Sequence, residues 1–307
     1  MSAEKKNTMK GFWSLMGSML LYAFSGVVVV GLSAAFGNVG QVTFRALAAL
    51  VLTIFWLVIS GFRYKLRYSD SYDKKWLVVD IICRPIYNIC FVYAALSIGP
   101  TAALFYLFAS KVIFGGLIKM IFGSKKKLFW ADYLSYVVVL VGLFVFTYPI
   151  NAFMSFGVIV GLISGLFEAI KSRAMNELNV KSEDRPVVAL YEFLSLAVVT
   201  AIVVLLVGQS FVIAPMTVTI WMVLGASGIV AVGSLFFELM GFAEFDDDLG
   251  NAVLASEMGF AGVINYLILG TNMSPTQIVG AVLLIVSLAF VAVAAYKRKK
   301  RDGQKGK

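Results

Sequence analysis

The sequence predicts an all-α integral membrane protein of about ten transmembrane helices, arranged as two inverted five-helix repeats with both termini cytoplasmic. Three observations predict this fold: an apolar composition, an alternation of basic and uncharged loops, and a weak internal repeat. Of the 307 residues, 60% are apolar or aromatic, whereas soluble domains contain about 45–50%. A bilayer accommodates this excess, because its hydrocarbon core is itself an apolar solvent.

Ten apolar segments follow one another along the chain, separated by charged residues and by Gly, Pro, Asn or Asp. Each segment is about as long as the roughly 20 residues that a helix needs to cross the hydrocarbon core. The first segment is too long for the apolar part of a cleavable signal, so we expect it to remain as a span. The predicted spans are 11–31, 39–61, 76–97, 101–122, 130–149, 155–173, 187–207, 219–241, 249–269 and 276–296.

Lys and Arg are concentrated in alternate loops, which predicts the orientation of the spans. The five intervening loops, with cores such as SIGPT and GTNMSP, carry no basic residue. Cytoplasmic loops are enriched in Lys and Arg, so the basic loops and both termini are predicted to be cytoplasmic. Topology therefore explains the net charge of +9 without nucleic-acid binding. The basic segments are Lys5 to Lys10, Arg63 to Lys75, Lys125 to Lys127, Lys171 to Arg185, and the tail from Lys297.

The two halves of the chain resemble each other at an offset of about 146 residues. The fourth span reads ASKVIFGGLIKMIFG and the ninth reads ASEMGFAGVINYLILG, with several identical positions. Five helices are an odd number, so the second unit must enter the membrane from the opposite side. Inverted repeats of this kind are a common scaffold of secondary transporters, with the binding site near the midplane. The predicted units are 1–150, and 151–307 with its basic tail.

Several stretches resemble the drug/metabolite transporter superfamily, in its ten-helix EamA-like branch. They are TFRALAAL from Thr43, FVYAALSIGPTAALFYLFAS from Phe91, VVVLVGLFVF from Val137, GVIVGLISGLFEAIKSR from Gly157, and SPTQIVGAVLLIVSLAFV from Ser274. The resemblance covers nearly the whole chain and implies a central cavity lined mainly by spans 1, 3, 4, 6, 8 and 9, worked by alternating access. The sequence departs from the family at Lys111 and Met258, where family members often carry proline.

Charged residues inside the spans are the candidate functional residues, because a charge at the bilayer centre costs roughly 2.5–3.5 kcal/mol on insertion scales. Lys111 and Glu257 occupy equivalent positions of the two repeats with opposite charge. We hypothesise that they meet as a midplane pair that opens around substrate; a permanent structural ion pair is the alternative. Arg45 and Glu192 are also near-equivalent, and a structural or gating role is favoured for both.

Two further groups of polar residues are candidate substrate ligands. Arg84 precedes Pro85 on the third span, and Tyr87 and Asn88 continue its face; this set suits a carboxylate or phosphate. The alternative for Arg84 is to satisfy carbonyls that the proline leaves free. Glu168 ends a stripe of small residues on the sixth span and suits an ammonium group or a coupling proton, whereas the stripe itself favours close helix packing.

The residue types exclude most enzyme classes. There is no His, which removes Ser–His and Cys–His catalysis and His-metal sites, and Cys83 and Cys90 read as small apolar side chains. No phosphate-binding Gly-rich loop with Lys is present. We therefore expect no enzyme activity, no cofactor and no metal. A channel or a non-transporting structural membrane protein is the alternative from another class.

The expected activity is secondary transport of a small polar metabolite, with an amino acid or related zwitterion favoured by the mixed charges. An organic anion such as a sugar phosphate, or an organic cation such as choline or S-adenosylmethionine, is the alternative substrate. The expected location is the cell membrane, or an organelle membrane in a eukaryote. The expected partners are the substrate, the lipid bilayer and either a coupling proton or a counter-substrate; nucleic acid is not expected, and a homodimer is left open.

Overall fold

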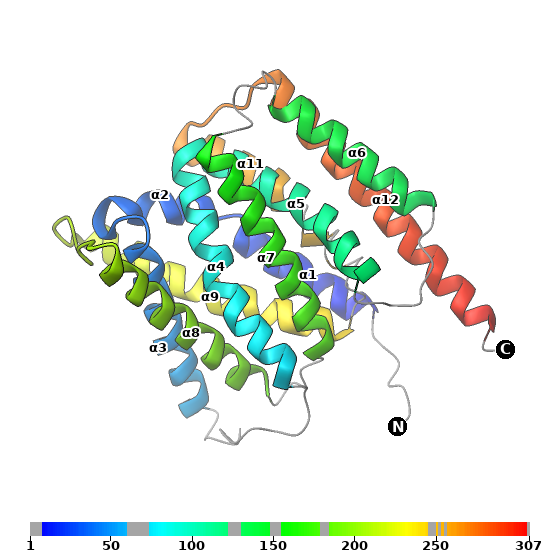
Figure 1. Ribbon diagram of the computed structural model, residues 1–307. Helices are drawn as coiled ribbons and strands as arrows, with labels where there is room; N and C mark the ends of the chain where they lie inside the picture. Colours follow the sequence, from blue (N-terminus) through cyan, green and yellow to red (C-terminus); the bar gives the residue numbers. More distant parts are fainter. Residues whose placement is uncertain are drawn as a thin grey trace.

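The protein is helical throughout the ranges that the structure describes. The structure, a computed structural model, describes residues 8–59, 74–121, 130–147, 155–178, 184–244, 250, 253–254 and 257–305. A helix lies over each of the predicted spans (Figure 1). The helices are α1 (Thr8–Tyr22), α2 (Ser25–Phe36), α3 (Gly40–Ile59), α4 (Lys74–Ile98), α5 (Pro100–Ile121), α6 (Trp130–Thr147), α7 (Phe156–Leu178), α8 (Arg185–Leu206), α9 (Val218–Glu244), α11 (Glu257–Leu269) and α12 (Pro275–Lys305).

The helices have the length and polarity of membrane spans. Within the described ranges, six helical stretches are long and apolar enough to cross a membrane: Met9–Phe36, Gly40–Ile59, Lys74–Ile98, Pro100–Ile118, Arg185–Leu206 and Val218–Glu244. Large apolar side chains on their outer surfaces are exposed, including Val51, Phe55 and Leu206. Such a surface is stable in lipid and unfavourable in water. The chain is therefore a multi-pass membrane protein.

The first predicted span differs from the prediction because it is two helices. α1 ends at Tyr22 and α2 begins at Ser25. At the break the Phe24 amide donates to the Leu21 carbonyl, three residues back, at 3.2 Å. A side chain at Gly26 would meet Pro100 Cβ at 2.7 Å, so glycine lets α2 approach the start of α5. Helices broken near the bilayer centre are typical of places where a membrane protein lines a cavity.

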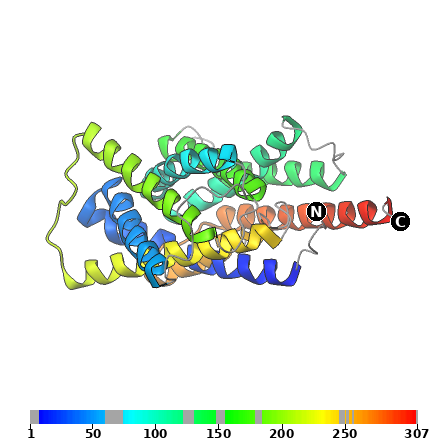
Figure 2. The same cartoon turned by 90° about the horizontal axis from the view of Figure 1, so that it is seen from below.

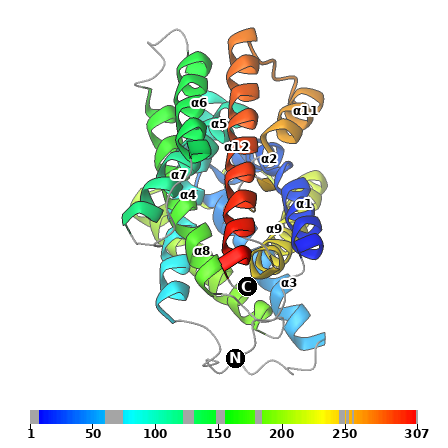
Figure 3. The ribbon, with the colours of Figure 1, turned by 90° about the vertical axis from the view of Figure 1, so that its right-hand side faces the viewer.

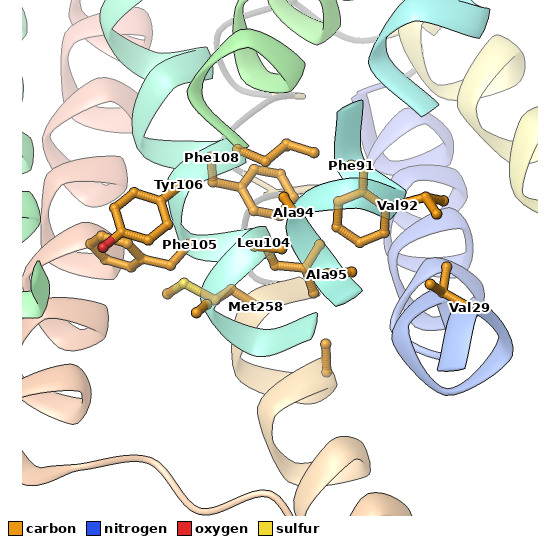
Figure 4. Close-up of a cluster of buried hydrophobic side chains, with 14 of the residues drawn as sticks. Val29, Phe91, Val92, Ala94, Ala95, Leu104, Phe105, Tyr106, Phe108 and Met258 are labelled. Carbon is orange, nitrogen blue, oxygen red and sulfur yellow. The ribbon is translucent and has the colours of Figure 1, made fainter. Parts of the chain in front are cut away.

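The helices of the two halves pack against each other. α7 lies against α4 and α5, α1 lies against α9, and α3 lies against α8 and α9. The stripe of small residues predicted to serve packing does so: a side chain at Gly161 would meet Tyr106 Cβ at 3.1 Å. Phe91, Leu104, Phe105 and Phe108 form part of the buried apolar cluster where α4 and α5 meet, and Met258 of α11 joins it (Figure 4).

α6 and α12 form a pair at one side of the bundle. They run alongside each other (Figure 3) and contact each other more extensively than they contact other helices. Two glycines allow the close approach, since a side chain at Gly280 would meet Gly142 O at 2.8 Å. At the far side of the bundle the link between α8 and α9 extends beyond the helix ends (Figure 2), and the Ile213 amide donates to the Ala35 carbonyl at 2.8 Å.

The sixth predicted span is longer than predicted. The sequence placed Lys171 and Arg173 at its cytoplasmic edge, but α7 continues to Leu178 and Lys171 is buried. The prediction that Lys171 belongs to a basic cytoplasmic segment was therefore wrong. Lys171 lies inside the helix bundle because a carboxylate of another helix pairs with it there. The predicted boundary between the repeats, at 150 and 151, lies outside the described residues, as do most of the predicted basic loops.

Candidate functional site

A cavity lies among the helices of both halves. It is lined by α1, α2, α3, α4, α5, α7, α9, α11 and the residue Leu254. The family resemblance implies that each of these spans except α3 lines the cavity. Five of the six predicted substrate ligands line it, and Arg84 does not. The lining residues are Tyr22, Ser25, Arg45, Tyr87, Asn88, Phe91, Leu104, Leu107, Phe108, Lys111, Glu168, Glu238, Leu254 and Glu257.

Lys111 pairs with Glu168 in this cavity. The Lys111 ammonium lies 3.0 Å from Glu168 Oε1, and both side chains are buried. Glu257 lines the same cavity, but within the described part of the chain it forms no ion pair with Lys111. The hypothesis that Lys111 and Glu257 form a midplane pair is therefore corrected. Glu168 projects from α7 towards α5 and reaches the ammonium first, so the two repeat-equivalent charges share a cavity without a contact.

A second buried lysine extends the network towards α9. The Lys171 ammonium lies 3.0 Å from Glu238 Oε1 and 3.7 Å from Glu168 Oε2. The Tyr22 hydroxyl donates to Glu238 Oε2 at 3.2 Å. The two lysines and the two glutamates thus balance in charge and cross-link α5, α7 and α9. Buried charges persist in an apolar interior only when they are paired in this way.

Arg84 pairs with Glu192 outside the cavity lining. Its guanidinium donates to Glu192 Oε2, and both side chains are buried between α4 and α8. The sequence treated Arg84 as a candidate substrate ligand and favoured a structural or gating role for Glu192. In the structure Glu192 is the partner of Arg84. Arg84 also lies over the Phe193 ring, 5.1 Å from its centroid. Substrate in the cavity would not reach this guanidinium in the observed arrangement.

Pro85 leaves the Ile81 carbonyl without its usual helix donor, and α8 supplies another. The Ser195 hydroxyl donates to Ile81 O at 2.7 Å. The sequence considered Arg84 for this function, but a hydroxyl from the neighbouring helix performs it. The backbone of α4 is therefore satisfied at the break, as an apolar environment requires.

Tyr87 and Asn88 do line the cavity, as the sequence proposed. The Asn88 amide donates to the Arg84 carbonyl at 3.0 Å, which fixes its orientation within α4. The Lys171 ammonium lies 5.4 Å from the centroid of the Tyr87 ring, which is the geometry of a cation–π contact. Tyr87 therefore connects the cavity wall to the charge network.

Two charged residues of the cavity lining form no ion pair within the described part of the chain. Arg45 contacts Gln41, with 3.4 Å between Nη1 and Oε1, and Glu257 accepts no hydrogen bond from the described residues. Within these ranges neither forms an ion pair. The other cavity charges neutralise one another, so Arg45 and Glu257 are the groups that remain available to a charged solute.

The sequence missed Tyr22, Lys171 and Glu238. Glu238 lies near the end of the predicted span 219–241, and Lys171 was counted with the cytoplasmic basic residues at the edge of the span 155–173. Tyr22 carried a usable signal: at the repeat offset of 146 residues it is the equivalent of Glu168. Pairing each charged span residue with its repeat equivalent would have identified it.

Comparisons with known proteins show the fold without a function. No protein-family model matches the chain, and no curated protein matches it. In all, 28 chains of solved structures match it in fold. One of these, described only as the crystal structure of a protein, is 14% identical with a TM-score of 0.70 and covers 94% of this chain and 99% of its own. At that identity the likeness shows a shared fold alone.

Proposed function

We propose that the protein is a secondary transporter of a small polar metabolite, with an amino acid or related zwitterion as the favoured substrate. The observation that carries the proposal is the cavity itself, which brings charges of both signs into the interior of an apolar helix bundle. Ionisable groups inside a membrane protein are costly and mark solute or ion pathways. Arg45 offers a cation to a carboxylate, and Glu257 offers a carboxyl group to an ammonium group.

We propose further that ten spans form two inverted repeats, as in the drug/metabolite transporter superfamily, with both termini cytoplasmic. The packing supports this arrangement, because a contact between two helices recurs between the equivalent helices of the other half. The contact of α4 with α7 corresponds to that of α9 with α1, and the contact of α3 with α9 corresponds to that of α8 with α4. The pairs α3 with α8 and α6 with α12 map onto themselves.

The geometry favours an organic cation as the second candidate over an organic anion. The anion alternative relied on Arg84 and Lys111, and carboxylates hold both of them. Lys111 and Lys171 hold Glu168 and Glu238, so Glu257 is the lining glutamate that forms no ion pair among the described residues. An organic cation could therefore occupy the end of the cavity at Glu257 without a group at Arg45.

A ligand screen tests the proposal. Purified protein would be melted with amino acids, sugar phosphates and quaternary ammonium compounds, as wild type, Glu257→Gln and Arg45→Gln. A ligand at 100 times its Kd stabilises the folded protein by about 2.7 kcal/mol. Glu177→Gln is the matched control, because Glu177 lies at the far end of α7 and pairs with Arg173.

We expect an amino acid to stabilise the wild type and the control but neither cavity variant. A cation that needs only Glu257 would replace the zwitterion with the second candidate. Counterflow in proteoliposomes then separates a transporter from a channel, because only a carrier exchanges labelled for unlabelled solute against a gradient. Failure of every solute class to stabilise the wild type would contradict the proposed substrate range.

A further inference from the structure

Three ionisable side chains form a cluster at the contact of α4 with α8, outside the cavity lining. Asp80 and Arg84 lie one helical turn apart on α4, and Glu192 faces them from α8. Their exposed fractions are 0%, 3% and 0%. The guanidinium of Arg84 donates to Glu192 Oε2. The cluster therefore holds two buried carboxyl groups and one guanidinium, and the guanidinium bonds to Glu192.

Among the described residues, Asp80 has no hydrogen-bond donor. Neither of its carboxyl oxygens accepts a hydrogen bond from them, and Glu192 Oε1 accepts none either. Yet the carboxyls of Asp80 and Glu192 lie within hydrogen-bonding reach of each other. Two ionised carboxylates cannot bond, since both are acceptors only. A hydrogen bond between them exists when one of the two carries a proton.

The surrounding charges do not neutralise Asp80. From α7, Lys171 lies within electrostatic range, but its ammonium bonds to Glu238 and contacts Glu168. Glu238 of α9, Tyr22 of α1 and Tyr87 of α4 also surround Arg84. Cys83 lies beside Asp80 on α4. The carboxylates of Glu192, Glu238 and Glu168 therefore already balance the charges of Arg84, Lys171 and Lys111 without a contribution from Asp80.

We propose that Asp80 and Glu192 share one proton, so that this cluster is a buried proton-binding site. A second ionised carboxylate here would be buried without a partner, beside another anion, and such a group costs far more than it gains. One proton removes both penalties: Glu192 keeps its ion pair with Arg84, and the Asp80 hydroxyl donates to a Glu192 oxygen. Glu168, the earlier candidate for a coupling proton, is held by two lysines instead.

The position of this site links it to the cavity, and this step rests on the proposed transport function. Lys171 interacts with Asp80 and also contacts Glu238 and Glu168, both of which line the cavity. Release of the proton adds a negative charge beside Lys171 and weakens its hold on those two glutamates. The proton is therefore the coupling ion that this arrangement fits, because its binding changes the charge presented to a solute.

Infrared spectroscopy of the purified full-length protein tests the shared proton directly. Protonated and ionised carboxyls absorb at different frequencies, and the difference between wild type and Asp80→Asn isolates the contribution of Asp80. We expect a band of a protonated carboxyl in the wild type that is lost in Asp80→Asn and in Glu192→Gln. In Glu192→Gln the remaining Asp80 ionises against Arg84, so both variants keep a balanced cluster and remain folded. Glu177→Gln is the control and should retain the band.

Two results would overturn the proposal. One is a difference spectrum between wild type and Asp80→Asn that contains only carboxylate bands, which would show that Asp80 is ionised. The other is a protonated-carboxyl band that persists unchanged in Glu192→Gln, because a proton that Asp80 keeps without Glu192 is not shared by the two carboxyls. The band does not depend on solute movement. A band without any solute-induced stabilisation would refute the transport proposal alone, and saturable counterflow without the band would refute the shared proton alone.

Discussion

Lys111 on α5 and Glu168 on α7 form a buried ion pair with 3.0 Å between Nζ and Oε1. The pair joins two helices of different halves and forms one wall of the cavity. Breaking a buried pair by removing one partner costs about 3–5 kcal/mol, whereas replacing both partners with neutral groups is often tolerated. The pair therefore predicts how a single and a double variant rank in stability.

We expect Lys111→Met to lower the unfolding free energy by about 3–5 kcal/mol, because Glu168 then keeps only the more distant Lys171. Lys111→Met with Glu168→Gln should recover most of that loss. Thermal unfolding of the detergent-purified single and double variants measures both. Equal destabilisation of the single and the double variant would show that the two residues do not act as a pair.

Arg84 and Glu192 predict a second cycle of the same design. Arg84→Met leaves Glu192 buried beside Asp80 without a cation, so we expect a loss of about 3–5 kcal/mol. Adding Glu192→Gln should restore most of the stability, because no isolated charge remains. Melting temperatures measure the effect. If Arg84→Met abolished ligand binding at wild-type stability, Arg84 would be a substrate ligand, as the sequence proposed.

Gly165 predicts a steric effect at the contact of α7 with α5. A side chain there would meet Ser110 Cβ at 2.6 Å and would also strike the Leu107 backbone. Overpacking of this kind costs about 1–3 kcal/mol, so Gly165→Ala should lower the melting temperature. Gly115→Ala is the matched control, since no atom lies within 4 Å of its added methyl group. Similar melting temperatures for the two variants would contradict this packing.

Pro85 and Ser195 predict a coupled pair of substitutions. The Ser195 hydroxyl serves the Ile81 carbonyl that Pro85 leaves free, so Ser195→Ala should cost about 1–3 kcal/mol, the penalty for an unsatisfied buried acceptor. Pro85→Ala restores a backbone amide that can donate to the same carbonyl. The cost of Ser195→Ala should therefore shrink in the Pro85→Ala background. An unchanged cost, measured from unfolding curves, would show that the hydroxyl does not replace that amide.

The sequence by itself determined the helical membrane fold and the approximate positions of the helices. Apolar segments of span length have few alternatives in a bilayer, because every backbone polar group must be satisfied within the segment. The sequence also identified which polar residues within the spans are unusual, since Lys111, Glu168, Glu257, Tyr87 and Asn88 all line one cavity. Periodicity and hydropathy were sufficient for these inferences, because each inference depends only on residues that are close to one another along the chain.

Only the tertiary structure decided which charges pair. Lys111 pairs with Glu168 and not with its repeat equivalent Glu257, and Glu192 pairs with Arg84. It also decided that Lys171 is buried and that the first span is broken at Tyr22. Ion pairing depends on helix rotation and on which helices touch, and a shift of one helical residue turns a side chain by about 100°. No property of one segment fixes that angle, because the packing of the neighbouring helices sets it.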